Sequence, residues 1–166
     1  MTDLVSFIVA EGVAIDQITS RVTVFNIIDH ALVSAVPSMM TRLTAVSQYR
    51  LSGQAKAFVE RVRVLSPDGV ELIASHSRVV MVPRTQHQLP NAHRSIHVLW
   101  SVKLPAAGDY SIVLERQPIT ELVDPSAGWE LLASQMMTVL EQPNFMLNSG
   151  PASGPPPSQG RTGSQG

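Results

Sequence analysis

The chain contains no cysteine, which excludes a disulfide framework and any thiol nucleophile. Charged residues make up only 15% of it, well under the ~25% that is usual for globular proteins. Its 12 basic and 13 acidic residues leave a formal net charge of −1, so no strong field favours nucleic acid or anionic lipid. We therefore expect neither nucleic acid nor membrane as a partner.

Long hydrophobic runs are also missing, because no stretch approaches the ~18 uninterrupted apolar residues that span a bilayer. The first 17 residues contain no Lys or Arg and no clear cleavage signature, so a secretory signal is not expected. With 44% hydrophobic residues, the chain is of the globular class and long enough for one domain. We expect a soluble, cytoplasmic protein.

The composition changes abruptly after Glu141. Thirteen of the last 19 residues are Gly, Pro or Ser, and Arg161 is the one charged side chain among them. Such a segment cannot bury enough apolar surface to offset its ordering entropy. We predict a single domain over residues 1–141 and a disordered Pro/Gly/Ser-rich tail over 142–166.

Before the tail, short alternating segments are separated by turn residues. Over residues 95–104 the alternation assigns Trp100 to the core and His97 to the opposite face. We expect this strand to form an antiparallel hairpin with residues 110–115, with Gly108 in the turn. A second hairpin, over residues 58–64 and 70–74, surrounds the turn sequence SPDG.

Further strands are predicted over residues 4–10, 22–28 and 43–50. Residues 129–139 fit either an amphipathic helix or a strand with a bulge near 133–135, and the neighbouring elements favour the strand. About eight short strands in one chain are typical of an all-β antiparallel sandwich, of the immunoglobulin or C2-like kind.

The segment DQITSRVTVFNIID, residues 16–29, resembles a family of bacterial domains of unknown function. The later turn Pro67-Asp68-Gly69 and the corner Gly108-Asp109-Tyr110 follow in the family's order, although Ser20 and Asn26 stand where Gly is expected. The resemblance covers about residues 3–140 and implies a β-sandwich without an established reaction. Its matching positions in the first segment are Asp16, Thr19, Arg21, Thr23, Phe25 and Ile27.

Catalytic and nucleotide-binding motifs are missing. The sequence has no G-x-S-x-G elbow, G-x-G-x-x-G loop or Walker A motif, so we expect neither an enzyme nor a bound cofactor. His93 and His97 would lie about 13 Å apart on a strand, too far to share a metal ion, and we expect both to face solvent. Calcium is an alternative ligand if the loop aspartates cluster, but turn formation is the more ordinary role of Asp16, Asp29, Asp68, Asp109 and Asp124.

Four residues are candidates for a binding loop. Asp16, Thr19 and Arg21 precede a strand, where they form either a polar binding loop or an Asx-type turn. Trp129 lies at an element boundary and is the aromatic residue considered for a partner surface, whereas Trp100 and Tyr110 are assigned to the core.

These observations favour a non-catalytic module that binds an unidentified protein. Recognition would use a loop end or a sheet edge, with the strand next to the hairpin ending at Glu115 as the candidate edge. The alternative is a small-ligand, carbohydrate or calcium-dependent binding domain that uses the loops at one end of the sandwich. Homo-oligomers through sheet edges are a third possibility.

Overall fold

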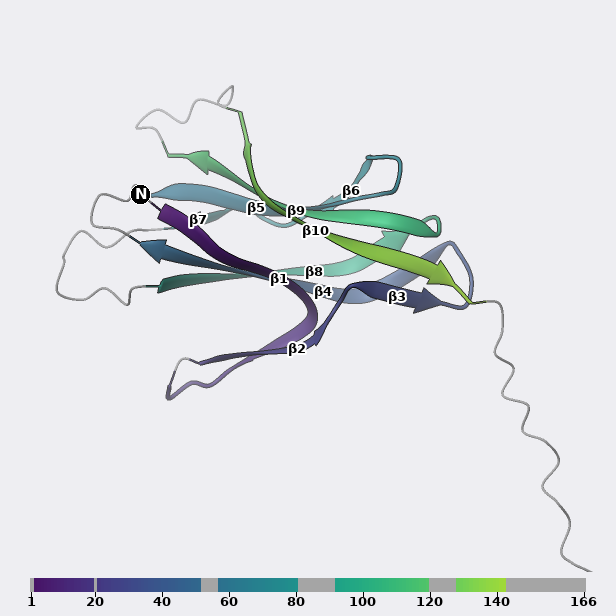
Figure 1. Cartoon of the computed structure of the whole chain (residues 1–166), viewed down its shortest axis with the longest axis horizontal. Coiled ribbons are helices and arrows are strands. Elements are labelled where there is room, and N and C mark those ends of the chain that lie inside the picture. The colour runs from purple at the N-terminus through teal and green to yellow at the C-terminus, as the bar shows by residue number, and fades with distance from the viewer. Residues whose placement is uncertain (1, 20, 52–56, 81–91, 120–127, 143–166) are drawn as a thin grey trace, which may run out of the picture.

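The computed structural model describes residues 2–19, 21–51, 57–80, 92–119 and 128–142. All regular structure in these residues is β-strand, which confirms the predicted all-β class (Figure 1). The predicted disordered tail lies outside the described residues except for Gln142. The strands are β1 (Thr2–Ile15), β2 (Val22–Ile27), β3 (His30–Val33), β4 (Ser38–Leu51), β5 (Phe58–Leu65), β6 (Glu71–Ala74), β7 (Arg78–Val80), β8 (Ala92–Leu104), β9 (Gly108–Pro118) and β10 (Glu130–Glu141).

The strands form two sheets that pack face to face as a sandwich (Figure 1). The four-stranded sheet has the order β2-β1-β4-β8, and the six-stranded sheet has the order β3-β10-β9-β5-β6, with β7 also pairing with β5. Neighbouring strands are antiparallel except for β3 and β10, which are parallel. The sandwich predicted from the sequence is therefore confirmed.

The core lies between the sheets and is built from alternating positions. On β5 every second residue is buried, beginning with Phe58. Tyr49 and Phe58 meet edge to face, with ring centroids 5.2 Å apart. Tyr110 is buried as predicted, and its hydroxyl donates to the Ala106 carbonyl at 2.6 Å.

β1 changes its partner within the four-stranded sheet. It pairs with β4 as far as Ala10, and from Ala10 to Ile15 it pairs with β2. The end of β1 and β2 therefore form a hairpin arm that extends from the sandwich (Figure 1). Gln135 of β10 secures the base of the arm, because its side chain accepts from the Val9 amide at 3.0 Å and donates to the Ile28 carbonyl at 2.8 Å.

The predicted hairpin between residues 95–104 and 110–115 is wrong. β8 pairs with β4 in one sheet, whereas β9 lies between β5 and β10 in the other, so the link before Gly108 crosses from sheet to sheet. Gly108 does adopt a positive φ of 131°. Both neighbours of β9 are internal strands, so the edge proposed next to Glu115 is wrong too. Alternation identifies a strand but carries no information about its partner.

The predicted faces of β8 are also wrong over its first half. The ladder pairs Met40 with Val102 and Arg42 with Trp100, and it passes over Thr41 and Ser101 between them. Ser101 has φ 55°, and the two strands exchange faces together at this point. As a result His97 is 1% exposed instead of facing solvent, and Trp100 is 58% exposed instead of lying in the core.

The structure resolves the alternative left open for the last element. Residues 130–141 form a strand, and the register of its pairing with β9 shifts between Leu131 and Ala133. The strand interpretation is confirmed, and the irregularity begins slightly before the predicted position.

Candidate functional site

The predicted binding loop around Asp16 is a compact turn at the tip of the hairpin arm. The Asp16 carboxylate accepts from the amides of Ile18 at 2.8 Å and Thr19 at 3.0 Å. These bonds, the one from Thr19 first, hold the pKa of the Asp16 carboxyl below its ordinary value. The Thr19 hydroxyl accepts from the Arg21 amide at 3.4 Å. The Asx-type turn explains this geometry, and a binding role for Asp16, Thr19 and Arg21 stays a prediction.

Trp129 lies beside the six-stranded sheet, so the structure does not group it with the arm residues. The Arg61 guanidinium lies 4.0 Å from the centroid of its ring. Arg61 and Arg63 both reach Glu115, at 2.8 and 3.1 Å. Arg116 lies in the row of the inward-facing Glu60 and pairs with Glu130 at 2.8 Å. Glu115 therefore neutralises the cations Arg61 and Arg63 on the outer side of this sheet, and one face of Trp129 is occupied by Arg61. Exposed apolar residues, Val79 and Met136, lie on the same side.

The outward side of the four-stranded sheet, which we call the outer face, is different in character. The register places Ile8, Val46 and Ile96 side by side on β1, β4 and β8. The next row toward the arm contains Ala10, Thr44 and Val98, of which Ala10 and Thr44 are buried and Val98 is exposed. Beyond the end of the pairing between β1 and β4, Arg42 pairs with Trp100. On β2, Ile27 lies opposite Ala10 and Phe25 opposite Gly12, and both are exposed.

Charges on the outer face are few and mostly of one sign. Among the described residues, four cations lie on it with one anion, Asp3, and a second anion, Glu11, lines a hollow beside Arg42 and Trp100 at the arm end; the cations are Arg42, Arg50, Arg94 and Lys103. None of the four forms an ion pair within the described ranges.

Arg42 is held in place at the end of the apolar rows. Its Nε donates to the Glu11 carbonyl at 2.8 Å, and its guanidinium carbon lies 5.8 Å from the Trp100 ring centroid. Gly12 makes room for this side chain, because a Cβ there would lie 2.2 Å from the Arg42 Nη2 atom. The arrangement positions a cation and an exposed indole together.

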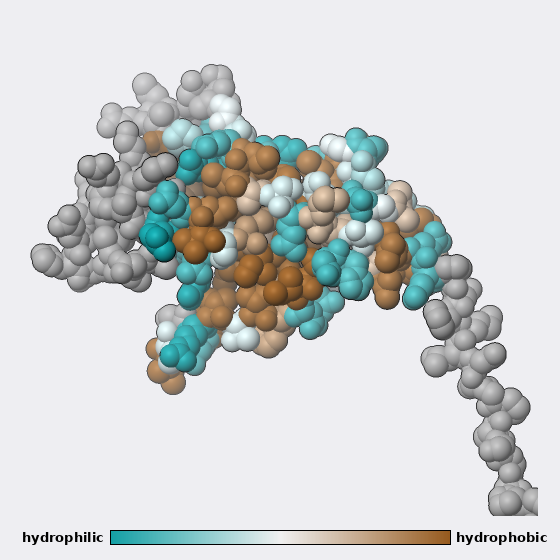
Figure 2. All heavy atoms as spheres, in the orientation of Figure 1, coloured by the Kyte–Doolittle hydropathy of each residue, from teal (hydrophilic) through white to brown (hydrophobic). Residues whose placement is uncertain are grey.

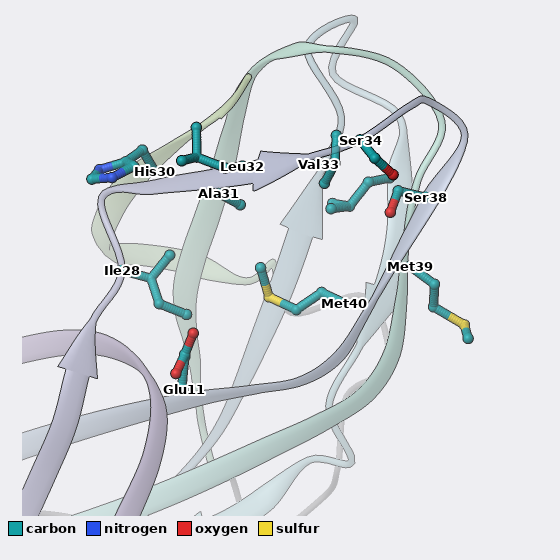
Figure 3. A pocket seen from close by; sticks show the side chains of 11 residues that line it. Glu11, Ile28, His30, Ala31, Leu32, Val33, Ser34, Ser38, Met39 and Met40 are labelled. Atoms are coloured by element: carbon teal, nitrogen blue, oxygen red, sulfur yellow. The ribbon is translucent and has the colours of Figure 1, made fainter. Parts of the chain in front are cut away.

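A pocket of about 550 Å³ lies between β3 and the beginning of β4. Figure 3 shows Ile28 and Met40 pointing into it from opposite walls, while His30 and Met39 point away. Figure 2 shows hydrophobic side chains over the middle of the molecule and again near β3. The Glu11 carboxylate lies at one end and accepts from the Asn26 amide group at 2.7 Å. We call this pocket the end groove.

A polar cluster that the sequence interpretation missed connects the two sheets inside the core. Glu60 of β5 has a fully buried side chain, and its carboxylate accepts from the Tyr49 hydroxyl at 2.5 Å and lies 3.0 Å from His97 Nε2. The Ser75 hydroxyl lies 2.9 Å from His97 Nδ1 and accepts from the Val62 amide at 2.9 Å. The available signal was the strand alternation itself, which assigns Glu60 to the same face as Phe58 and Val62.

The protonation of this cluster follows from its contacts. Burial raises the pKa of Glu60, but the bonds from His97, Ser95 and Tyr49 together outweigh it and hold the pKa below its ordinary value. Burial and the neighbouring Glu60 charge raise the pKa of Tyr49. The cluster is therefore an ionised carboxylate surrounded by donors. It has the group types of a hydrolase triad in Ser75, His97 and Glu60, but His97 and Glu60 are enclosed in the core, and the expectation that the protein is not an enzyme stays a prediction.

The described part of the chain has no group of three or more His, Cys, Asp or Glu side chains suited to a metal ion. It also contains no helix of the length and apolarity that crossing a bilayer requires.

Comparison with known proteins gives a family and no function. None of the curated proteins matches this sequence. The profile described as "Family of unknown function (DUF6941)" matches residues 5–117, which is more than half of the chain. The match includes all four strands of the outer face and the residues of the buried cluster, and it confirms the resemblance to a family of unknown function. The chain therefore belongs to the DUF6941 family.

Proposed function

We propose that the protein is a non-catalytic module that binds a partner protein through the outer face, and that the partner presents an apolar strip flanked by acidic side chains. The observation that carries this proposal is the row Ile27, Ala10, Thr44 and Val98, which crosses all four strands. Ala10 and Thr44 are buried, whereas the ends of the row are exposed apolar side chains, with Phe25 near Ile27 and Trp100 near Val98. Exposed apolar side chains that gather on one sheet are a mark of an interaction site.

The cations around the exposed apolar side chains support the same conclusion. Arg42, Arg50, Arg94 and Lys103 add the polar border that stable interfaces have around an apolar centre.

The six-stranded sheet provides an internal comparison of charge. Its outer side carries Arg61 and Arg63, which both pair with Glu115, beside the exposed apolar residues Val79 and Met136. The outer face differs in its charges, because its cations form no ion pair within the described residues.

The cations of the outer face favour a partner with acidic side chains. Arg42, Arg50, Arg94 and Lys103 have no carboxylate partner among the described residues, so acidic groups on an incoming surface would meet them without displacing an existing ion pair. A second copy fits less well, because two outer faces packed together would bring like charges to one interface. The aliphatic centre also favours protein over nucleic acid, which is bound through stacking aromatics and phosphate contacts.

The test is site-specific photo-crosslinking in the native host. A benzophenone amino acid replaces Val98 on the outer face or, as a matched control, Met136, which is 58% exposed on the six-stranded sheet. The proposal predicts an adduct with one protein at position 98, little at 136, and loss of that complex in V98E/W100E but not in M136E. Equal labelling at both positions, an adduct of twice the chain's mass, or an adduct with nucleic acid would overturn it.

With the purified partner, affinity should also fall as salt rises, since the rim charges act through solvent. Arg94→Glu should weaken binding about tenfold or more, whereas Arg61→Glu on the other sheet should change it little.

A further inference from the structure

The end groove is bordered by two strand edges that lack a partner. β3 is the last strand of the six-stranded sheet and pairs only with β10 among the described strands. The first residues of β4, from Ser38 to Leu43, pair with β8 on one side. On their other side they have no strand partner among the described residues, because β1 pairs with β4 only at Thr44 and the residues after it. Free edges of this kind accept an additional strand.

The backbone direction of β3 shows which groups face the groove. The Thr138 amide donates to the Asp29 carbonyl and the Gln142 amide to the Val33 carbonyl, both at 2.9 Å. Because successive residues of a strand direct their backbone groups to opposite sides, Leu32 and Ser34 direct theirs away from β10 and toward the groove. The amides and carbonyls of these two residues are therefore available to an added strand.

The side chains of the groove favour an apolar occupant. Its floor contains Ile28, Ala31, Met40 and Leu104. Leu32 and Met39 line its border, and they are 55% and 60% exposed. Glu11, which already accepts a hydrogen bond from Asn26, is the only acidic residue that lines it. An extended, uncharged, hydrophobic segment matches these walls.

The chain itself supplies such a segment next to the groove. Gln142 is bonded to Val33, a groove residue, and the sequence continues Pro143-Asn144-Phe145-Met146-Leu147. Crossing the end of β3 from β10 to the free edge covers two strand spacings, about 10 Å, which three extended residues span. Phe145, Met146 and Leu147 are three consecutive apolar residues, and the 19 residues after them are mostly Gly, Pro and Ser.

We infer that residues 145–147 dock in the end groove as a short added strand, antiparallel to β3. Because Phe145 follows Gln142 by only three residues, its effective concentration is in the millimolar range, so even a weak contact is populated. The docked segment would cover the apolar floor and close the free edge of β3, which otherwise invites pairing between copies. This inference concerns a different surface from the outer face and does not depend on the proposed partner.

The absence of cysteine in the natural chain makes a disulfide scan a clean test. One cysteine replaces Leu32, and a second is placed in turn at each position from 144 to 150 in the full-length chain. An added strand predicts intramolecular disulfide yields that alternate with a period of two, differing several-fold between neighbouring positions. With Val79→Cys of β7 as the fixed control, no alternation is expected. Yields that fall smoothly with distance, or disulfides that link two chains, would overturn the inference.

Amide exchange provides a second measurement in the intact fold. The Leu32 and Ser34 amides should exchange about tenfold faster in F145D/L147D than in the natural chain, while the matched tail variant A152D leaves them unchanged. The Ile112 amide in β9 monitors folding and should not change in either variant. Equal exchange at Leu32 and Ser34 in all three proteins would contradict docking.

Discussion

Removal of the Glu60 carboxylate is the perturbation with the largest expected cost. In Glu60→Leu the side chain loses its charge but keeps its approximate size, while the Tyr49 hydroxyl and His97 Nε2 remain buried without an acceptor. Each unsatisfied buried group costs about 1–3 kcal/mol, and loss of one member of a buried pair costs about 3–5 kcal/mol. We therefore expect the free energy of unfolding to fall by about 3–5 kcal/mol, out of a total of about 5–15 kcal/mol.

Glu60→Gln is the matched variant, because it preserves the shape and still offers one acceptor. The Gln carbonyl can accept from Tyr49, and its amino group can donate to His97 if the imidazole proton moves to Nδ1 and points to Ser75. The chain of hydrogen bonds is then complete, although without charge assistance. A loss of about 1 kcal/mol is expected.

Urea unfolding at pH 7, followed by the fluorescence of Trp100 and Trp129, measures both variants against the natural chain. If the carboxylate organises the cluster, Glu60→Leu lowers the free energy of unfolding several times more than Glu60→Gln does. If the two variants lose equal stability, or if Glu60→Leu loses under about 1 kcal/mol, the buried carboxylate does not organise the cluster. The triple variant Y49F/E60L/H97L should regain stability relative to Glu60→Leu, since the Tyr49 hydroxyl and the His97 ring are then no longer buried without an acceptor.

Three further predictions concern acid, the Tyr110 corner and the base of the arm. The pKa of folded Glu60 lies below its ordinary value of 4.5. The contribution of Glu60 to stability is therefore complete above pH 4.5 and is lost as the pH falls through the lower folded pKa. Between pH 7 and 3 the urea midpoint should fall less steeply for Glu60→Gln than for the natural chain. Tyr110→Phe removes the bond to Ala106 and should cost about 1 kcal/mol in the same assay. Gln135→Leu leaves two backbone groups unpaired and should cost about 2 kcal/mol and speed amide exchange at Val9.

Much of the fold could be predicted because local patterns identify strands and turns. β5 alternates as expected, and Gly69 and Gly108 adopt the positive φ that their turns require. Strand pairing could not be predicted, because it is decided by side-chain packing between distant segments. The link between residues 104 and 108 is as short as a hairpin turn, yet it crosses between sheets.

The candidate sites illustrate the same limit. The outer face combines residues from four separated strands, and no spacing in the sequence groups Phe25 with Trp100. The buried cluster was missed for a different reason: Glu60 was passed over as an ordinary charged residue within a strand, although its position in the alternation points inward. A charged residue at an inward position is a signal in itself, because its burial requires donors on the opposite sheet.

The buried cluster and the outer face have one structural origin, the exchange of faces at Thr41 and Ser101. Before the exchange β8 turns His97 inward, where it meets Glu60 of the other sheet, and the same half of the strand turns Val98 and Trp100 outward. Continuous alternation that kept Val102 and Leu104 in the core would instead bury Trp100 and expose His97. The core would lose its charge partner, and the outer face would lose its most exposed aromatic. A single irregularity in the ladder therefore determines both the polar link between the sheets and the exposure of Val98 and Trp100 on the surface that we propose as a binding site.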